Sequence, residues 1–169
     1  GSNDDGSVAV GTASVSGTLA AVDPDSGATA TWSVVGAPSN TYGNFTINAS
    51  TGVWTYSVDN TKAATQALRE GDSVSQSFTV RVTDDKGATA DQAIAVTING
   101  TNDAPVVTTP AGGELGAVRA AGHFDNGTVD GGSATVSGTL TAADVDTGAT
   151  QSWSLVGTPS TTYGSIAID

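Results

Sequence analysis

The chain contains no cysteine, and this absence excludes several kinds of chemistry at once. Disulfide bonds, thiolate metal sites and cysteine nucleophiles all require that residue. A small β-domain outside the cell often uses a disulfide for rigidity. A domain without one must obtain rigidity elsewhere, and bound Ca²⁺ is a source that needs only oxygen ligands.

Positive charge is also scarce. The sequence has 5 Lys and Arg residues against 17 Asp and Glu residues, so its formal net charge is -12 at pH 7. Because phosphate binding needs clustered cations, we expect no nucleic-acid partner. The same imbalance argues against binding to anionic membrane surfaces, and no apolar run is long enough to cross a membrane. A surface this acidic attracts divalent cations.

Residues that favour strands and turns are abundant. Thr and Val favour pleated strands, whereas Gly and Ser supply turns. Alternation of apolar and polar residues predicts strands around residues 15–19, 32–34, 45–47, 54–58, 78–82 and 94–98. A short helical turn is expected within residues 61–69. The pattern predicts an all-β fold, an antiparallel β-sandwich of the immunoglobulin type.

The sequence also repeats itself. Residues 13–48 align without a gap to residues 134–169, at an offset of 134 − 13 = 121, and about 22 of the 36 positions are identical. Residues 49–100 have no counterpart in the second copy. We therefore expect one repeat at residues 1–99, an acidic linker at residues 100–105, and the incomplete N-terminal part of a second repeat at residues 106–169.

Several motifs, in order, resemble the VCBS repeat of large bacterial surface adhesins. They are VSGTLAAVDPDSG, TYGNFTINASTGVWTYSVDN, QALREGD, FTVRVTDDKGATA and IAVTINGTNDAP. They also resemble cadherin repeats, whose DxDSG, LDRE, AxD and linker motifs correspond here to residues 23–27, 68–70, 83–84 and 101–105. This resemblance implies Ig-like or cadherin-like sandwiches in tandem, with calcium at their junctions.

Candidate calcium ligands follow partly from spacing and partly from that resemblance. Side chains two residues apart on an extended segment point the same way, so Asp23 with Asp25, and Asp144 with Asp146, could each share an ion. The resemblance adds Glu70, Asn102 and Asp103, which would meet Asp144 and Asp146 at the junction. It also places Asp84 with Asp23 and Asp25, facing a preceding domain.

Each of these features has a simpler interpretation. A DxDxG sequence can be a solvated turn, and its recurrence at the 121-residue offset is what favours calcium. The tryptophans could stack on sugars, but their alternation with Val and Tyr favours the sandwich core. His123 is more simply a loop residue. No positioned base accompanies any serine, and no cleft pattern accompanies the paired carboxylates, so we expect no enzyme.

The resemblance implies a structural extender repeat of an adhesin that is stiffened by Ca²⁺ and supports adhesion or biofilm formation. Its partners would be neighbouring repeats, and its location the surface of a Gram-negative cell after type I secretion. The alternative is a lectin-like module that binds exopolysaccharide through calcium. Residues 134–169 lack partner strands, so they would be disordered, pair with another chain by strand swapping, or compete with residues 13–48 for strands in residues 49–100. We favour an ordered arrangement that borrows strands.

Overall fold

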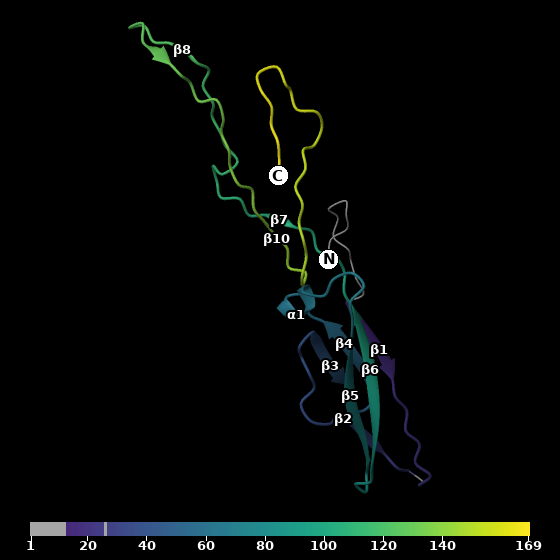
Figure 1. Cartoon of the computed structure of the whole chain (residues 1–169). Coiled ribbons are helices and arrows are strands. Elements are labelled where there is room, and N and C mark those ends of the chain that lie inside the picture. Colours follow the sequence, from purple (N-terminus) through teal and green to yellow (C-terminus); the bar gives the residue numbers. More distant parts are fainter. Residues whose placement is uncertain (1–12, 26) are drawn as a thin grey trace. The chain divides into compact units, whose positions relative to one another are not determined.

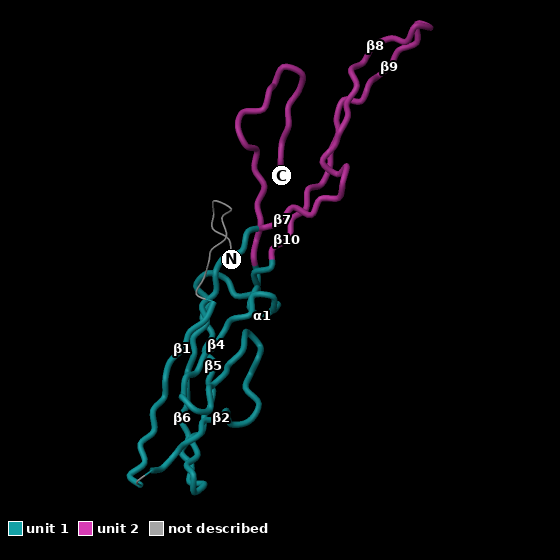
Figure 2. The backbone as a smooth tube through the Cα atoms, turned by 180° about the vertical axis from the view of Figure 1, so that it is seen from behind, with its two compact units in different colours: residues 1–104, 145–148 teal, residues 105–144, 149–169 magenta. Residues whose placement is uncertain are grey.

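The computed structural model describes residues 13–25 and 27–169, and the chain divides into two units (Figure 2). The first unit comprises Gly1–Ala104 and Val145–Gly148, and the second comprises Pro105–Asp144 and Ala149–Asp169. Residues 1–12 of the expected first repeat lie outside the described residues. The division falls within the expected linker, but four residues of the second repeat group with the first unit.

The first unit contains two three-stranded antiparallel sheets (Figure 1). One has the order β1-β4-β3 and the other β2-β5-β6. The strands are β1 (Ser14–Thr18), β2 (Ala30–Val34), β3 (Gly43–Ile47), β4 (Val53–Val58), β5 (Ser73–Asp84) and β6 (Thr89–Asn99), with the helical turn α1 (Ala63–Gln66) between β4 and β5. The all-β class and the six strands predicted from alternation are confirmed.

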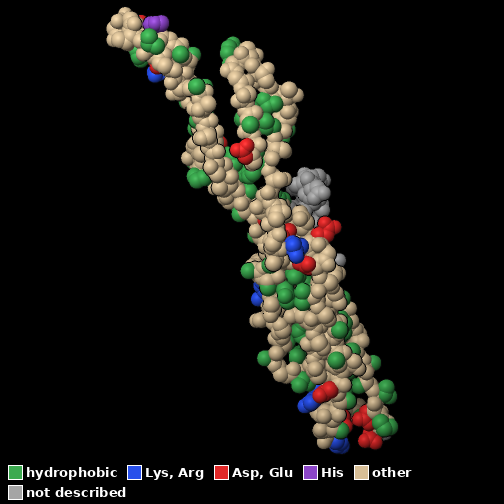
Figure 3. Space-filling view, in the orientation of Figure 1, with side chains coloured by type: hydrophobic (Ala, Val, Ile, Leu, Met, Phe, Trp, Pro, Cys, Tyr) green, Lys and Arg blue, Asp and Glu red, His purple; other side chains and the backbone are tan. Residues whose placement is uncertain are grey.

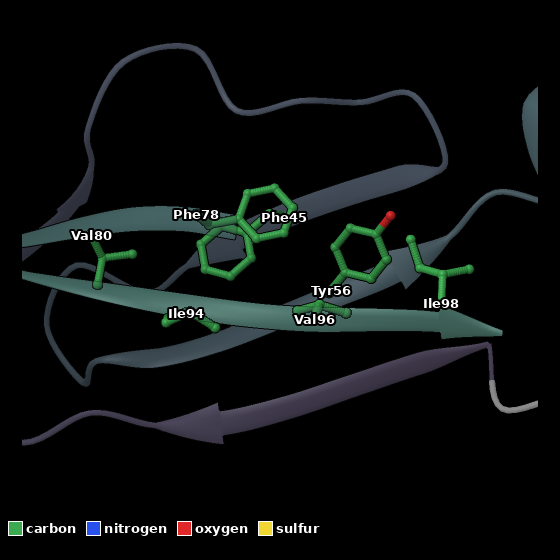
Figure 4. Close-up of a cluster of buried hydrophobic side chains, with 7 residues drawn as sticks. All are labelled: Phe45, Tyr56, Phe78, Val80, Ile94, Val96 and Ile98. Carbon is green, nitrogen blue, oxygen red and sulfur yellow. The ribbon is translucent and has the colours of Figure 1, made fainter. Parts of the chain in front are cut away.

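The hydrophobic core lies between these sheets (Figure 4). Phe45 and Tyr56 come from one sheet, and five residues come from the other: Phe78, Val80, Ile94, Val96 and Ile98. Phe45 stacks on Phe78 with ring centroids 4.5 Å apart, and Tyr56 lies 5.5 Å from Phe78. The period-2 pattern selects these residues because alternate side chains of a strand point to the same face.

Two tight turns set the register of neighbouring strands. In the β3–β4 turn, the Asn48 side chain accepts hydrogen bonds from the Ser50 and Thr51 amides, each at 3.0 Å. Gly52 completes that turn with φ of 68°. In the β5–β6 turn, Asp84 Oδ1 accepts hydrogen bonds from the amides of Lys86 and Ala88 at 2.9 and 2.8 Å. These side chains satisfy backbone donors that the ladders leave unpaired.

The structure corrects one expectation about which side chains are buried. Trp32 and Trp54 pack against the core as predicted, but Trp153 is 36% exposed. Val15 pairs with the buried Tyr56 across the β1–β4 ladder, yet it is 45% exposed. Alternation therefore identifies a strand but does not fix how well each of its side chains is covered.

The second unit contains only two-residue strands: β7 (Val106–Val107) pairs with β10 (Ala142–Ala143), and β8 (Gly122–His123) pairs with β9 (Val129–Asp130). Around Trp153, the equivalent of Trp32 in β2, the structure has no strand, and no segment pairs there as β5 pairs with β2. Within the described ranges, no helix has the length and apolar character needed to span a membrane.

Candidate metal centres

One predicted ligand, Glu70, lies within the turn at residues 67–72. The Asp72 side chain accepts a hydrogen bond from the Arg69 amide at 3.0 Å, and the Asp72 amide donates to the Arg69 carbonyl at 3.0 Å. Gly71, with φ of 90°, allows the chain to reverse here. The turn leaves Glu70 exposed to solvent.

The linker packs directly against this turn. The Gly100 amide donates to the Asp72 carbonyl at 2.9 Å. A Cβ at Gly100 would collide with the Arg69 carbonyl oxygen and would lie 2.6 Å from the Leu68 carbonyl oxygen. Only glycine therefore permits this approach. Asp103, three residues further on, lines the same groove as Leu68 and Gly100, and the Asn102 side-chain amide donates to the Asp103 carbonyl at 3.0 Å.

The acidic motif of the second repeat contacts the same linker within the first unit. The Asp103 amide donates to Asp146 Oδ2 at 3.0 Å, and the Thr147 amide donates to the Ala67 carbonyl at 3.3 Å. Asp146 is only 5% exposed. A buried carboxylate is stable only where donors or cations surround it, and the Asp103 amide supplies one donor.

A second group of predicted ligands lies at the opposite end of the first unit. Ser73 pairs with Asn99 at one end of the β5–β6 hairpin, and Thr83 pairs with Thr89 at the other, so Asp84 is remote from the linker. Asp23 and Asp84 line one surface hollow of about 650 Å³. Asp23 Oδ1 accepts a hydrogen bond from the Asp25 amide at 2.9 Å. Figure 3 shows acidic side chains at both ends of the first unit.

Asp85, which follows Asp84 in the chain, has a lowered pKa. A hydrogen bond from the Lys86 ammonium, at 2.7 Å, lowers the pKa of Asp85 below its ordinary value. Asp85 is thus charged throughout the neutral range and already paired with a cation. It adds negative charge next to Asp84 without being a predicted ligand.

The structure thus brings Asp103 and Asp146 into contact and places Asp23 with Asp84, while Asp144 is half-buried in the second unit. Across residues 13–25 and 27–169, no three Asp, Glu, His or Cys side chains converge closely enough to hold a metal ion. The donors nevertheless suit calcium in type, because calcium takes carboxylate, amide and backbone oxygens. Calcium binding stays a prediction.

Sequence reasoning missed one acidic residue of this region. Asp72 joins the turn to the linker through both its side chain and its carbonyl, as its bonds to Arg69 and Gly100 show. The signal was present in the sequence, since the Gly71-Asp72 pair directly after Glu70 is typical of a tight turn. Its role in this structure is to position the linker.

Comparison with known proteins gave one family match. The model of a family described as "Bacterial cadherin-like domain" matches residues 1–100, which is more than half of the 169-residue chain. No curated protein matches the chain. The matched range ends where the linker begins.

Proposed function

We propose, from the premise that this chain belongs to the family of bacterial cadherin-like domains, that it is an extender repeat of a bacterial cell-surface adhesin. The cadherin-like all-β domain is a structural and adhesive type of fold rather than one typical of enzymes. In this role, repeats stand end to end and hold a binding domain away from the cell. The neighbouring repeats are its principal partners.

One observation carries the proposal: the linker after the first repeat is bonded to the acidic motif of the second. The Asp103 amide donates to the buried Asp146 carboxylate at 3.0 Å. A flexible linker between two independent domains would need no such hydrogen bond. An extender repeat needs a linker that the following repeat holds in a defined conformation.

We also propose that calcium stiffens this junction. Glu70, Asn102, Asp103, Asp144 and Asp146 would hold one ion, and Asp23, Asp25 and Asp84 would contribute to another at the opposite end. When bound, Ca²⁺ supplies the positive charge that offsets these carboxylates and six to eight coordination positions for oxygen ligands. The chain's own contribution is to fix the linker against the turn at residues 67–72 by means of Gly100 and Asp72.

Calorimetry of the full chain tests the calcium proposal. Melting is recorded in excess chelator and in millimolar Ca²⁺, for the unaltered chain and for Asp144→Asn/Asp146→Asn. The matched control Glu114→Gln/Asp125→Asn removes the same charge from exposed positions. A calcium concentration of a hundred times Kd stabilises the folded state by roughly 2.7 kcal/mol per site. For a domain of this size that raises Tm by about 10–20 °C.

We expect the junction variant to lose a calcium equivalent by titration and the control to keep it. Equal Tm in chelator and calcium would refute calcium stabilisation. Full stoichiometry in the junction variant would refute only the assignment of Asp144 and Asp146. Calcium-dependent binding of an acidic exopolysaccharide by the chain would instead favour a lectin-like module.

We place the chain outside the cell, on the surface of a Gram-negative bacterium after type I secretion. The absence of cysteine and the strongly acidic composition suit a domain that folds when it meets external calcium. Surface display is tested by adding protease to intact source cells and following the repeat with an antibody. Protection of the repeat in intact cells, with cleavage after lysis, would contradict this location.

A further inference from the structure

The edge strands of the first unit differ greatly in length. The sheet orders β1-β4-β3 and β2-β5-β6 make β1, β3, β2 and β6 the edge strands. Three of these strands have five residues each, whereas β6 has 11. Short edge strands limit pairing with other chains, so of these four strands β6 is the one that offers a long edge.

Two backbone hydrogen bonds show which groups of β6 point away from β5. At one end of the hairpin the Asp84 amide donates to the Ala88 carbonyl at 3.0 Å, and at the other end the Gly100 amide donates to the Asp72 carbonyl at 2.9 Å. Because hydrogen-bonded pairs alternate along an antiparallel ladder, the even-numbered residues of β6 bond to β5. The odd-numbered residues therefore direct their amide and carbonyl groups to the other edge. They are Thr89, Asp91, Ala93, Ala95, Thr97 and Asn99.

This edge of β6 lacks the features by which proteins usually protect an edge strand. Within residues 13–25 and 27–169, β5 is the one strand that pairs with β6, and all the odd-numbered residues of β6 are exposed. The sequence of β6 contains no Lys and no Pro, and its continuous register with β5 contains no bulge. Residues 94–98 are uncharged and rich in β-branched side chains. The edge is therefore a ready template for another strand.

The strand that fits this edge best is a second copy of β6. Two antiparallel β6 strands related by a two-fold axis at Ala95 would pair Asp91 with Asn99 and Ala93 with Thr97 of the other copy. All these residues are odd-numbered, so each pair can exchange two backbone hydrogen bonds. The outward side chains nearest the axis are small, so they do not hold the two strands apart. A two-fold contact of this kind is closed and joins two chains only.

Charge favours the same register. Asp91 is the one charged residue in the sequence of β6, and its carboxylate already accepts hydrogen bonds from Arg81 at 2.7 and 2.8 Å. With the axis at Ala95, each Asp91 faces the uncharged Asn99, and the two Asp91 residues lie 99 − 91 = 8 positions apart along the ladder, about 27 Å. An axis at Asp91 would instead set two carboxylates directly opposite each other, which is destabilising.

We propose that β6 is a self-association edge, through which two copies of this chain pair side by side. The two β6 strands run antiparallel about a two-fold axis at Ala95. The two sheets of order β2-β5-β6 thereby become one continuous sheet across the pair. This inference goes beyond the extender role and rests on neither that role nor calcium.

Sedimentation equilibrium of the full chain measures the association. A contact between strand edges is small, so the concentration series should extend from about 1 µM to about 1 mM. Salt at about 0.15 M screens the repulsion between two acidic chains, because the Debye length is then about 8 Å. Ala95→Lys places two like charges on the two-fold axis. The control Ser57→Lys adds the same charge to an exposed position on β4, the central strand of the other sheet.

We expect a concentration-dependent dimer that Ala95→Lys weakens by at least about tenfold and Ser57→Lys changes by less than about twofold. A chain that stays monomeric throughout the series would overturn the proposal, and so would equal weakening by the two variants. A monomer whose urea unfolding midpoint falls with Ala95→Lys would also overturn it, because that result would place a segment of the same chain on this edge.

Disulfide trapping tests the register separately. The chain has no cysteine, so each variant carries a single thiol. In the proposed pair the two copies of residue 95 face each other with Cα atoms about 5.5 Å apart, a distance that a disulfide spans. The two copies of residue 93 lie 97 − 93 = 4 positions apart, about 14 Å. Ala95→Cys should therefore form a cross-linked dimer at least about tenfold faster than the matched control Ala93→Cys. Equal rates for the two variants would overturn the pairing about Ala95.

Discussion

The buried hydrogen-bond network at Tyr56 permits a quantitative test of the first unit. Tyr56 is 1% exposed, and its hydroxyl donates to Gln76 Oε1 at 2.8 Å. The Gln76 side-chain amide donates in turn to Ser39 Oγ at 2.9 Å. Tyr56→Phe removes only the hydroxyl, because the ring that lies against Phe78 is retained.

The expected cost comes from the acceptor that is left behind. Gln76 is 9% exposed, so its Oε1 cannot turn to bulk water, and an unsatisfied buried polar atom costs about 1–3 kcal/mol. Gln76→Leu should lower the free energy of unfolding by a similar amount, because it leaves the Tyr56 hydroxyl without its acceptor. The double variant replaces both partners by apolar groups and should cost less than the sum of the single variants by about 1–2 kcal/mol.

Urea unfolding followed by tryptophan fluorescence measures all three variants. A loss of 2 kcal/mol would lower Tm by about 10 °C in a domain of this size. The unfolding slope should stay constant, since the surface exposed on unfolding hardly changes. The reasoning is refuted if Tyr56→Phe costs less than about 0.5 kcal/mol or if the two single costs simply add.

Three further outcomes follow from the core and the surface. Burial, with a smaller contribution from Tyr42, raises the pKa of Tyr56 above its ordinary 10.0. As the pH rises, the unfolded state therefore loses that proton before the folded state does, and the free energy of unfolding should fall above about pH 10. Urea unfolding at several pH values should show a weaker fall in Tyr56→Phe. An equal fall in that variant would contradict this cause. Phe78→Ala should cost about 3–5 kcal/mol in the same assay, since Phe78 is 2% exposed at the centre of the core, and a cost below 1 kcal/mol would refute that position. The Arg81–Asp91 ion pair has contacts of 2.7 and 2.8 Å, but both side chains are about 40% exposed. Because exposed ion pairs contribute little to stability, Asp91→Ala should change Tm by only a few degrees. A larger drop would show that Asp91 has a role beyond the pair.

Local patterns predicted the first unit well because each of its strands is marked by its own sequence. Phe78 and Val80, or Ile94, Val96 and Ile98, recur at every second position, and turn residues such as Asn48 and Asp84 separate the runs. Such signals need no knowledge of distant residues. The 121-residue repeat was equally evident, because identity between two segments is a property of the sequence itself.

The contacts between distant segments depend on tertiary structure. The family resemblance implied that Asp103 would meet Asp146, but neither DxD spacing nor composition contains that approach, which depends on Gly100 letting the linker lie against the turn at residues 67–72. Trp32 and Trp153 occupy equivalent places in near-identical sequences, yet only Trp32 has a strand, because β5 pairs with it. A β-strand forms only when a partner satisfies its backbone and covers its side chains, so the same local sequence is a strand in one place and an exposed segment in the other.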